Sequence, residues 1–541
     1  MKKRILAAMM AAALALACTA CAPPETTTSS QGGSTSGSAD GSVTQTAGEP
    51  QYGGSLKATI NGDPTSLDAM MVNVEQEQIP ATHIFETAIS LDASGAPWPG
   101  VCDYTYEDNV LTLTVRDGVT FHNGNPCTAE DVKASFDRWV ENVSSARTQV
   151  MDHAQSVEVV DNSLVITFAE PAPVALTTIG AYDQGLYIIP KEICEQYGSE
   201  RIADADCIGT GPYKYVEHLP DRYVLLERYD EYVPTENEGA SGMAAPKMAY
   251  CDELYFYPVS DKMARITGVQ TGEYDVGIGV PANMMATLSA DPNLVVETKD
   301  LGIFCGLVFN NQSGPCADQN LRNAILACLD MDDLMLAAQG DASLYRLNPC
   351  VMMTTSQWYV EDSLGKYNAP DLEKAQEYLD ASSYNGETLV FITTKDNDYM
   401  YKTAMVVAEA VKPIGINMDV QVYDNATLKE YRDDPTKYDM FSSGLGDKND
   451  PSEVVFLDSA WAGFWDSEAK NALVEELSNA VEFEDRYAIW EEICQLVYEE
   501  VPNITFGERI NPIVYQKYVH NLFDTKQKFY WNTWIDGESA S

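Results

Sequence analysis

The stretch LTVRDGVTFHNG at residues 113–124, followed by TAEDV at 128–132, contains a strand, a turn and the start of a helix in close succession. Apolar and polar residues alternate over 111–116, as they do in a strand with one buried face. Asp117-Gly118 is a typical turn pair that ends this strand. Thr128 begins a Thr-Ala-Glu-Asp sequence that resembles a capping box at a helix start. The apolar stripe of that helix consists of Val132, Phe136, Trp139 and Val140.

The same pattern of short strands and amphipathic helices continues on both sides of this stretch. Residues 164–168 and 223–229 have the composition of strands, and apolar helical stripes recur in 321–328, 372–379 and 487–497. At 541 residues the chain is too long for a single core, and its length is typical of roughly three domains. The sequence therefore predicts an α/β fold whose lobes share one compact body.

The charge balance excludes several classes of partner. The chain has 82 acidic and 34 basic side chains, which gives a formal net charge of −48. Such a charge repels nucleic acid and anionic membrane surfaces, so we predict that the protein binds neither directly. Two explanations of the charge remain open, namely attraction of cationic or ammonium-bearing ligands and solubility outside the cell.

The N-terminal residues have the pattern of a targeting segment. Lys2-Lys3-Arg4 precede an apolar stretch at 5–17 that is rich in Ala and Leu. This combination is typical of a secretory signal peptide and is too short for a stable transmembrane helix. We therefore predict that residues 1–20 are a signal peptide and that the remainder of the chain is exported.

A cysteine and a flexible segment follow the predicted signal peptide. Thr19-Ala20-Cys21 resembles a bacterial lipobox, in which the cysteine thiol receives diacylglycerol and becomes the new N-terminus. We predict Cys21 as the lipidated residue, and Cys18 is the alternative. Residues 21–52 are rich in Thr, Ser, Gly and Gln, so they cannot form a core and act as a linker spanning roughly 30 Å. The body is then held at the extracellular face of the cell membrane by its lipid anchor alone.

The cysteines and histidines of the body carry no recognisable metal motif. Ten cysteines follow Cys21, and Cys194 with Cys207 is the nearest plausible disulfide pair, although buried free thiols are the favoured explanation for most of them. Only five histidines occur in the chain, and no Cys or His cluster has the spacing of a zinc site. We predict no metal site and no cofactor.

A series of further motifs extends along the body of the chain. The motifs are Pro64-Thr65-Ser66-Leu67-Asp68, Phe85-Glu86-Thr87, Gly209-Thr210-Gly211-Pro212-Tyr213, Gln270-Thr271-Gly272-Glu273-Tyr274-Asp275 and Phe309-Asn310-Asn311. Together with LTVRDGVTFHNG they resemble, in this order, the extracellular solute-binding protein family 5, whose members bind peptides, nickel or glutathione for ABC importers. The resemblance runs from about residue 53 to residue 521.

The resemblance implies a periplasmic-binding-protein-like fold of class II, of the oligopeptide-binder type. Two lobes close on a ligand, and a smaller extra domain sits on the first lobe. We expect lobe I with the inserted domain at 53–300, lobe II at 301–500 and a return to lobe I at 501–541. The implied partners are a small peptide or peptide-like ligand and the ABC permease subunits, and we expect a monomer.

Most of the motif residues are expected to support the architecture. Arg116 and Asp131 are better placed to hold strand and helix ends than to contact a ligand. His122 lies in a turn between Phe121 and Gly124, where a structural role is favoured over a metal or catalytic one.

A peptide needs a carboxylate for its ammonium group, and Asp447 is the best candidate. In oligopeptide and dipeptide binders an Asp four residues before a Pro contacts the ligand's amino terminus, and Asp447 stands four before Pro451. A turn acceptor is the alternative role of Asp447. Asp450 is a second candidate, although its place beside Pro451 favours a capping role. Residues 439–446 lack the Arg and Trp that oligopeptide binders carry there, so any ligand carboxylate is held differently.

Other candidates form the walls of the expected site. Asn73 and Glu75 occupy positions where oligopeptide binders supply backbone and carboxylate contacts to an extended ligand, and a solvated loop is the alternative. Trp461 is a candidate pocket wall, because flat aromatic rings contact varied side chains at low entropic cost, and core packing is its alternative role.

Three functions remain in competition. The first is capture of small peptides or peptide-like solutes, and the second is binding of a metal chelate, glutathione or an opine on the same fold. The third is an extracellular hydrolase, but the chain has no G-x-S-x-G elbow and no HExxH sequence. We therefore predict a binding protein that is not an enzyme.

Overall fold

The computed structural model describes residues 48–362, 364–523 and 525–536, which fold as one compact unit. The predicted signal peptide, Cys18, Cys21 and most of the predicted linker lie outside these residues. Among the residues described, no helix is both long enough and apolar enough to cross a bilayer.

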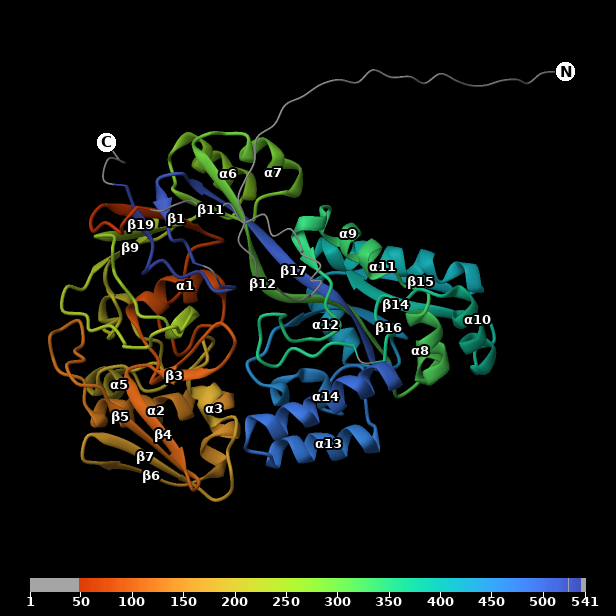
Figure 1. The fold of residues 1–541 in the computed structure, drawn as a ribbon, viewed down its shortest axis with the longest axis horizontal. Coiled ribbons are helices and arrows are strands. Elements are labelled where there is room, and N and C mark those ends of the chain that lie inside the picture. Colours follow the sequence, from red (N-terminus) through yellow and green to blue (C-terminus); the bar gives the residue numbers. More distant parts are fainter. Residues whose placement is uncertain (1–47, 363, 524, 537–541) are drawn as a thin grey trace, which may run out of the picture. The chain divides into compact units, whose positions relative to one another are not determined.

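A large mixed sheet is the main architectural element of the structure (Figure 1). Its strands lie in the order β15-β14-β16-β12-β17-β11-β1-β10-β9-β8, with β13 paired to β17. Their bounds are β1 Ser55–Ile60, β8 Tyr213–Leu219, β9 Tyr223–Arg228, β10 Glu253–Pro258, β11 Val276–Ile278, β12 Leu294–Phe309, β13 Tyr345–Arg346, β14 Thr388–Thr394, β15 Asn417–Tyr423, β16 Met440–Gly446 and β17 Asn503–Gln516.

The long antiparallel strands β12 and β17 connect two halves of this sheet. At one end β17 pairs with β11 through Ile513–Tyr515, and at the other end β12 pairs with β16 through Ile303–Phe309. The β12–β17 ladder changes register between Asp300 and Phe304, and Gly302 in this interval has a φ of +68°. The two halves have separate apolar cores, one formed from 56–278 and 513–535 and others formed within 304–506. These cores define two lobes joined by β12 and β17.

Lobe I contains β1 and β8–β11, together with a second, antiparallel sheet in the order β4-β5-β7-β6. The strands of this smaller sheet are β4 Cys102–Glu107, β5 Val110–Val115, β6 Ala154–Val160 and β7 Ser163–Phe168. The helices of lobe I are α1 Glu75–Ile84, α2 Ala129–Asn142, α3 Ser144–Gln149, α4 Ala175–Ile179, α5 Lys191–Tyr197, α6 Lys262–Thr271 and α7 Ala282–Ser289, and the short strands β2 Ile89–Leu91 and β3 Pro97–Pro99 form a hairpin.

The stretch that opened the sequence analysis folds as predicted. Strand β5 has an alternating pattern of burial, and α2 begins after Thr128 with a complete capping box. The backbone N–H of Thr128 donates to Asp131 at 2.9 Å, and Asp131 also accepts from the backbone of Lys191 at 2.8 Å. The expected structural role of Asp131 is therefore observed.

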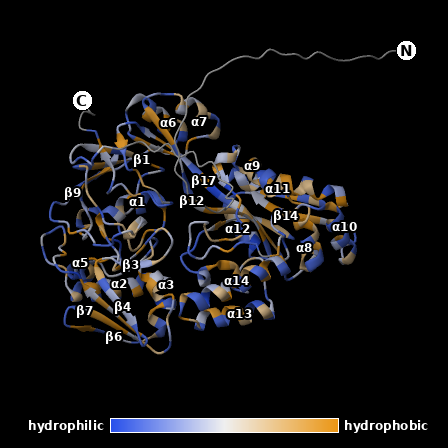
Figure 2. Cartoon of the chain, viewed as in Figure 1, coloured by the Kyte–Doolittle hydropathy of each residue, from blue (hydrophilic) through white to orange (hydrophobic). Residues whose placement is uncertain are grey.

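Lobe II contains β14, β15 and β16 with helices packed around them (Figure 1). The helices are α8 Gln319–Leu326, α9 Met331–Gln339, α10 Leu372–Ala381, α11 Asp398–Ala410, α12 Asn425–Arg432, α13 Glu468–Asn479 and α14 Phe483–Glu500. After the chain has returned to lobe I, β18 Val519–His520 pairs with β19 Trp534–Ile535. Figure 2 shows hydrophobic residues concentrated in strands such as β7 and β14, whereas helices α10 and α11 carry both kinds of residue. This distribution is the one that the apolar helical stripes predicted.

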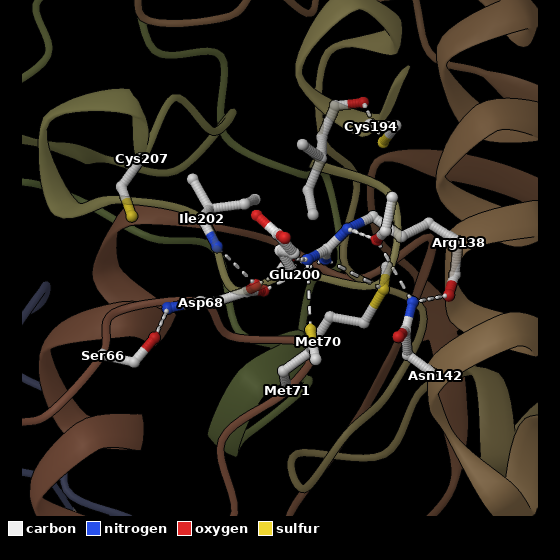
Figure 3. Close-up of polar contacts among 12 residues, drawn as sticks. Ser66, Asp68, Met70, Met71, Arg138, Asn142, Cys194, Glu200, Ile202 and Cys207 are labelled. Carbon is white, nitrogen blue, oxygen red and sulfur yellow. Dashed lines mark hydrogen bonds and ion pairs between the residues drawn. The ribbon is translucent and has the colours of Figure 1, made fainter. Parts of the chain in front are cut away.

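Asp68 of the Pro-Thr-Ser-Leu-Asp motif forms a buried ion pair with Arg138 of α2 (Figure 3). The two closest atoms, Oδ2 and Nη2, are 2.7 Å apart, and Asp68 also accepts from the backbone N–H of Ile202. Arg138 donates in addition to the carbonyl oxygens of Gly198 and Glu200. The motif, α2 and the segment 198–202 are therefore tied together within lobe I.

The cysteines of the described chain are free thiols. The Cys194–Cys207 disulfide that the spacing allowed is absent from the described residues. Cys194 lies near the carbonyl oxygen of Ile189, and Cys207 lies near that of Ala203. Burial raises the pKa of the Cys194 thiol to about 12, which keeps it protonated and unreactive.

His122 supports the Gly209-Thr210-Gly211 loop, as expected. Its Nε2 lies 2.9 Å from the carbonyl oxygen of Gly211, and its Nδ1 accepts from the backbone N–H of Gly209 at 3.3 Å. Burial lowers the pKa of His122 to about 4, so the ring is neutral. A side chain on Gly209 or Gly211 would overlap backbone carbonyl oxygens at the end of α1.

Candidate ligand-binding site

Asp447 lies in a narrow cleft lined by residues of both lobes. It directly follows β16, and its backbone N–H donates to the carbonyl oxygen of Gly302 in β12 at 2.9 Å. Lobe I contributes the loop Asp92–Gly95, and the backbone N–H of Gln357 in lobe II donates to Ser94 of that loop at 3.2 Å. The remaining lining residues are Leu91, Tyr182, Met243, Ser356, Lys448, Asn449, Lys526 and Gln527.

The carboxylate of Asp447 is already paired by a residue of its own chain. It forms an ion pair with the ammonium group of Lys526 and accepts from the backbone N–H of Met353 at 3.1 Å. The side chain of Asp447 is 7% exposed and that of Lys526 is 24% exposed. The cleft has a volume of about 20 Å³, which is enough for a water molecule and not for a solute. A solute therefore enters this cleft only if Lys526 or the lobes move.

Asp450, three residues farther along the loop, has a different environment. Its carboxylate lies 2.5 Å from Arg486 of α14, and each side chain is 3% exposed. It also accepts from the backbone N–H of Ser452 at 2.9 Å and so caps the short helix η7 Pro451–Glu453. The capping role considered for Asp450 is observed, and Asp450 is not among the residues that line the cleft.

Glu75 and Asn73 stand at the start of α1. Glu75 is the first residue of that helix, and it pairs with Lys528 and accepts from the side chain of Asn61 at 2.9 Å. Asn73 is exposed in the preceding loop. Neither residue lines the cleft around Asp447. Lys526 and Lys528 thus place two ammonium groups of one short segment on the carboxylates of two candidate residues.

A larger hollow lies beside β16 and shares Lys448 with the cleft. Its volume is about 220 Å³. Its lining consists of Val351, Arg432, Ser443, Gly444, Leu445, Gly446, Lys448, Val454, Val455, Phe456 and Trp461. The indole of Trp461 packs against Phe441 with ring centroids 6.1 Å apart. Trp461 therefore forms part of a pocket wall and also packs against the core, and the two roles considered for it coexist.

The backbone of β16 is exposed to this hollow along one edge. On one side β12 pairs with β16 throughout, from Met440 to Gly446. On the other side β14 pairs with β16 only at Met440 and Phe441. Within the described chain, the residues from Ser443 to Gly446 therefore have no strand partner on that edge. An extended ligand can add to such an edge by backbone hydrogen bonds.

Sequence reasoning missed Lys526 and Arg432. Lys526 lies 79 residues from Asp447, and only folding brings the two together. The one available signal was the unusual pair of lysines in Thr525-Lys526-Gln527-Lys528 of a strongly acidic chain. Arg432 ends α12 and carries no motif, so its place beside Trp461 is a consequence of packing alone.

The described residues contain no group of three or more His, Cys, Asp or Glu side chains placed to hold a metal ion. Three carboxylates near the cleft are each paired with one cation, whereas Lys448 in its lining forms no ion pair within the described residues.

Two α/β lobes joined by paired long strands, with a polar cleft between them, define a two-lobe solute-binding protein. The chain belongs to the bacterial extracellular solute-binding proteins, family 5, because the model of the middle region of that family matches residues 103–466. It is therefore a periplasmic or extracellular binding protein of the kind that serves ABC transporters.

Individual relatives are similar over most of the chain. A probable peptide ABC transporter periplasmic-binding protein, y4tO of Sinorhizobium fredii, is 26% identical over 493 residues, which are 86% of this chain and 91% of that protein. Among solved structures, the ABC transporter substrate-binding protein CtaP of Listeria monocytogenes superposes with a TM-score of 0.75 at 20% identity, over 90% of this chain and all of that one. The binding protein AgaA of Agrobacterium tumefaciens R10, in complex with agropinic acid, has a TM-score of 0.67 at 20% identity, over 90% of this chain and 99% of that one.

Proposed function

We propose that this protein is the extracellular substrate-binding lipoprotein of an ABC importer, and that it captures small peptides or peptide-like solutes between its lobes and delivers them to the permease. The observation that carries this proposal is the position of Asp447, whose carboxylate lies at the end of β16 in a cleft lined by both lobes. A carboxylate in this setting is the partner that a peptide's ammonium group needs.

Lys526 pairs with Asp447 in the ligand-free protein. A largely buried carboxylate without a counter-charge is strongly unfavourable, and Lys526 supplies that charge before a ligand arrives. When the ammonium group of a peptide replaces Lys526, Asp447 exchanges one cation for another and is never left unpaired. The ligand's ammonium therefore competes with Lys526 for Asp447, and the affinity reflects the difference between the two pairings.

The edge of β16 supports a peptide in particular. Ser443–Gly446 offer backbone donors and acceptors at the point where β14 has ended. A peptide in extended conformation presents matching groups at strand spacing, whereas a compact metal chelate does not. This edge leads directly to Asp447 in the sequence, so one ligand can reach both.

The expected domain limits remain part of the proposal. Lobe I with its inserted smaller domain spans 53–300, lobe II spans 301–500, and the chain returns to lobe I at 501–541. The register change near Gly302 and the return of β17 to β11 support these limits. The register change is also the natural site for a hinge, because an irregular ladder bends at lower cost than a regular one.

Membrane attachment through Cys21, with Cys18 as the alternative, belongs to the same proposal. A monomeric body on a flexible linker can meet its permease while it stays at the extracellular face of the membrane. Mass spectrometry of the mature N-terminal peptide tests the anchor, and we expect a diacylglycerol-modified Cys21 at the first position.

One observation favours a second candidate function. AgaA, which has a similar fold, binds agropinic acid, and the missing Arg in 439–446 removes a clamp that oligopeptide binders use. A binder of such a modified solute, or of glutathione or a metal chelate, therefore remains the alternative. The extracellular hydrolase has no comparable support.

Binding measurements with matched ligands test the proposed function. The purified protein is titrated with the tripeptide Ala-Ala-Ala, with its N-acetyl derivative and with agropinic acid, by calorimetry and by thermal unfolding. We expect the free tripeptide to bind and to raise the melting temperature, since a ligand at 100 times its Kd stabilises by about 2.7 kcal/mol. We expect the acetylated tripeptide to bind at least tenfold more weakly. Equal binding of the two tripeptides would overturn the role of Asp447, and binding of agropinic acid alone would favour the alternative.

A further inference from the structure

The hollow beside β16 has a charge opposite to that of the whole protein. The chain carries 82 acidic side chains against 34 basic ones. The lining of the hollow nevertheless contains two cations, Arg432 and Lys448, and no acidic residue. Acidic residues outnumber basic ones more than twofold in the chain, so two cations without an acidic residue in one lining run against its overall composition.

Arg432 lies at the wall of the hollow with part of its hydrogen-bonding capacity unused. Its guanidinium carbon is 5.7 Å from the centre of the Trp461 ring, as in a cation–π contact. Its Nε is buried and donates no hydrogen bond to a described residue, although it forms a loose ion pair with the exposed carboxylate of the adjacent Asp433 at 3.5 Å. The side chain is 30% exposed and packs against the indole, and its Nη groups donate no hydrogen bond to the part of the chain that the structure describes.

Lys448 is the second cation and joins the hollow to the cleft around Asp447. Within the described residues it forms no ion pair, unlike Lys526 and Lys528. Glu453 lies close enough for Lys448 to affect its titration, but burial, followed by the charge of Asp450, raises the pKa of Glu453 to about 7. Near neutral pH Glu453 therefore carries only part of a negative charge, and the charge of Lys448 also acts on the carboxyl of Asp183.

The other walls of the hollow are apolar or backbone. Phe456, Trp461 and Leu445 supply flat or branched hydrophobic surface, and Gly446 leaves the strand backbone uncovered, whereas Tyr399 lies over Gly444. A guanidinium and an ammonium beside hydrophobic walls bind a carboxylate attached to an apolar group, because partial desolvation strengthens the ionic contact. A neutral amide of the same shape gains the apolar contact without the ionic one.

We propose that this hollow is a subsite for a carboxylate that the solute carries, with Arg432 and Lys448 as its partners and with Trp461 and Phe456 against the adjoining apolar part. It deepens the proposed function, since it assumes that the rest of the solute lies in the neighbouring cleft. It also accounts for the missing Arg in 439–446, because Arg432 and Lys448 supply the cations on either side of that stretch. The protein therefore selects acidic solutes despite its own net charge of −48.

The hollow is tested directly with a small probe that does not depend on the peptide proposal. Ligand-observed NMR and calorimetry compare phenylacetate with phenylacetamide, which have the same ring and differ in charge. We expect saturable binding of phenylacetate and at least tenfold weaker binding of phenylacetamide. Equal binding of the two, or no binding of phenylacetate at millimolar concentration, would overturn the proposal.

Variants assign the binding to the two cations. We expect Arg432→Gln and Lys448→Gln each to weaken phenylacetate at least tenfold and to leave phenylacetamide unchanged, whereas Arg432→Lys retains part of the affinity. The exposed Arg222 provides the matched control, and Arg222→Gln should have no effect. An unchanged melting temperature shows that each variant is folded, and unchanged phenylacetate binding in folded Arg432→Gln contradicts the proposal.

The two proposals fail in different ways. If Ala-Ala-Ala does not bind but phenylacetate does so with the expected dependence on Arg432, the subsite stands and the peptide function is wrong. If the tripeptide binds through its ammonium group and phenylacetate does not bind, the function stands and the subsite is wrong.

Discussion

Asp447 and Asp450 stand three residues apart in one loop, and each forms an ion pair, but the two pairs have different surroundings. Asp450 and Arg486 are both 3% exposed, and Arg486 also donates to the backbone oxygens of Leu477 and Ala480. Lys526 is 24% exposed and lies in the cleft, and its one ionic partner among the described residues is Asp447. We therefore expect the buried Asp450–Arg486 pair to be fixed and the Asp447–Lys526 pair to be exchangeable for a ligand.

The largest effect is expected from breaking the fixed pair. Asp450→Ala leaves the buried guanidinium of Arg486 without its carboxylate and removes the cap of η7, so we expect the free energy of unfolding to fall by about 3–5 kcal/mol. Denaturant unfolding measures this loss. The exposed pair of Lys133 and Asp137 is the control, and Asp137→Ala should cost about 0.5 kcal/mol or less. A loss for Asp450→Ala as small as that of the control would show that the two pairs of the loop are equivalent.

Substitution of Asp447, the carboxylate of the exchangeable pair, should affect ligand binding more than stability. Asp447→Ala removes the proposed partner of the ligand's ammonium, and we expect the affinity for Ala-Ala-Ala to fall by about 2 kcal/mol or more, which is roughly thirtyfold. Calorimetry gives the affinity, and denaturant unfolding of the same variant gives the stability. An unchanged affinity together with a large loss of stability would place Asp447 in the same class as Asp450.

Substitution of Lys526, the cation of the exchangeable pair, should lower the stability of the free protein and raise its affinity for the ligand. Lys526→Met leaves Asp447 without its internal counter-charge, so we expect the free protein to lose about 1 kcal/mol of stability. The same variant no longer competes with the ligand, and its affinity for Ala-Ala-Ala should rise several-fold. Lys528→Met is the matched control, because Lys528 belongs to the same segment and pairs with Glu75 outside the cleft. If the affinity falls in Lys526→Met, Lys526 supports the ligand and does not compete with it.

The sequence predicted a large part of this fold and a smaller part of the site. The strand at 111–116, the capping box at Thr128 and the structural role of His122 follow from local residue patterns, and the structure confirms them. Its distance from Pro451 predicts Asp447 as a ligand-binding residue; Asp447 lines the cleft, and its contact with a ligand stays a prediction.

The difference between Asp447 and Asp450 was not predictable to the same degree. Both stand in Gly446-Asp447-Lys448-Asn449-Asp450-Pro451, and local sequence gives each a turn or capping role. Their environments are decided by Arg486, 36 residues beyond Asp450, and by Lys526, 79 residues beyond Asp447. Contacts of this range depend on how whole elements pack, which residue patterns within one segment do not contain.

His218 adds an ion-pair network whose strength depends on pH. Its Nδ1 lies 2.7 Å from Asp204 and its Nε2 lies 3.1 Å from Asp63. Burial alone would lower the pKa of His218, but the hydrogen bonds to Asp204 and Asp63 outweigh it and raise that pKa above 6.5.

A group whose pKa is raised in the folded state contributes its full stabilisation below the pKa of the unfolded chain, and this contribution disappears as the pH rises through the folded pKa. Burial raises the pKa of Glu453 to about 7, so Glu453 adds to the same slope. We expect stability measured by denaturant unfolding to fall between about pH 6 and pH 8, and the slope to be smaller in His218→Gln. If the slope is unchanged in His218→Gln, groups other than His218 cause it. The substitutions at Asp447 and Asp450 would then be the sharper test of how burial fixes an ion pair.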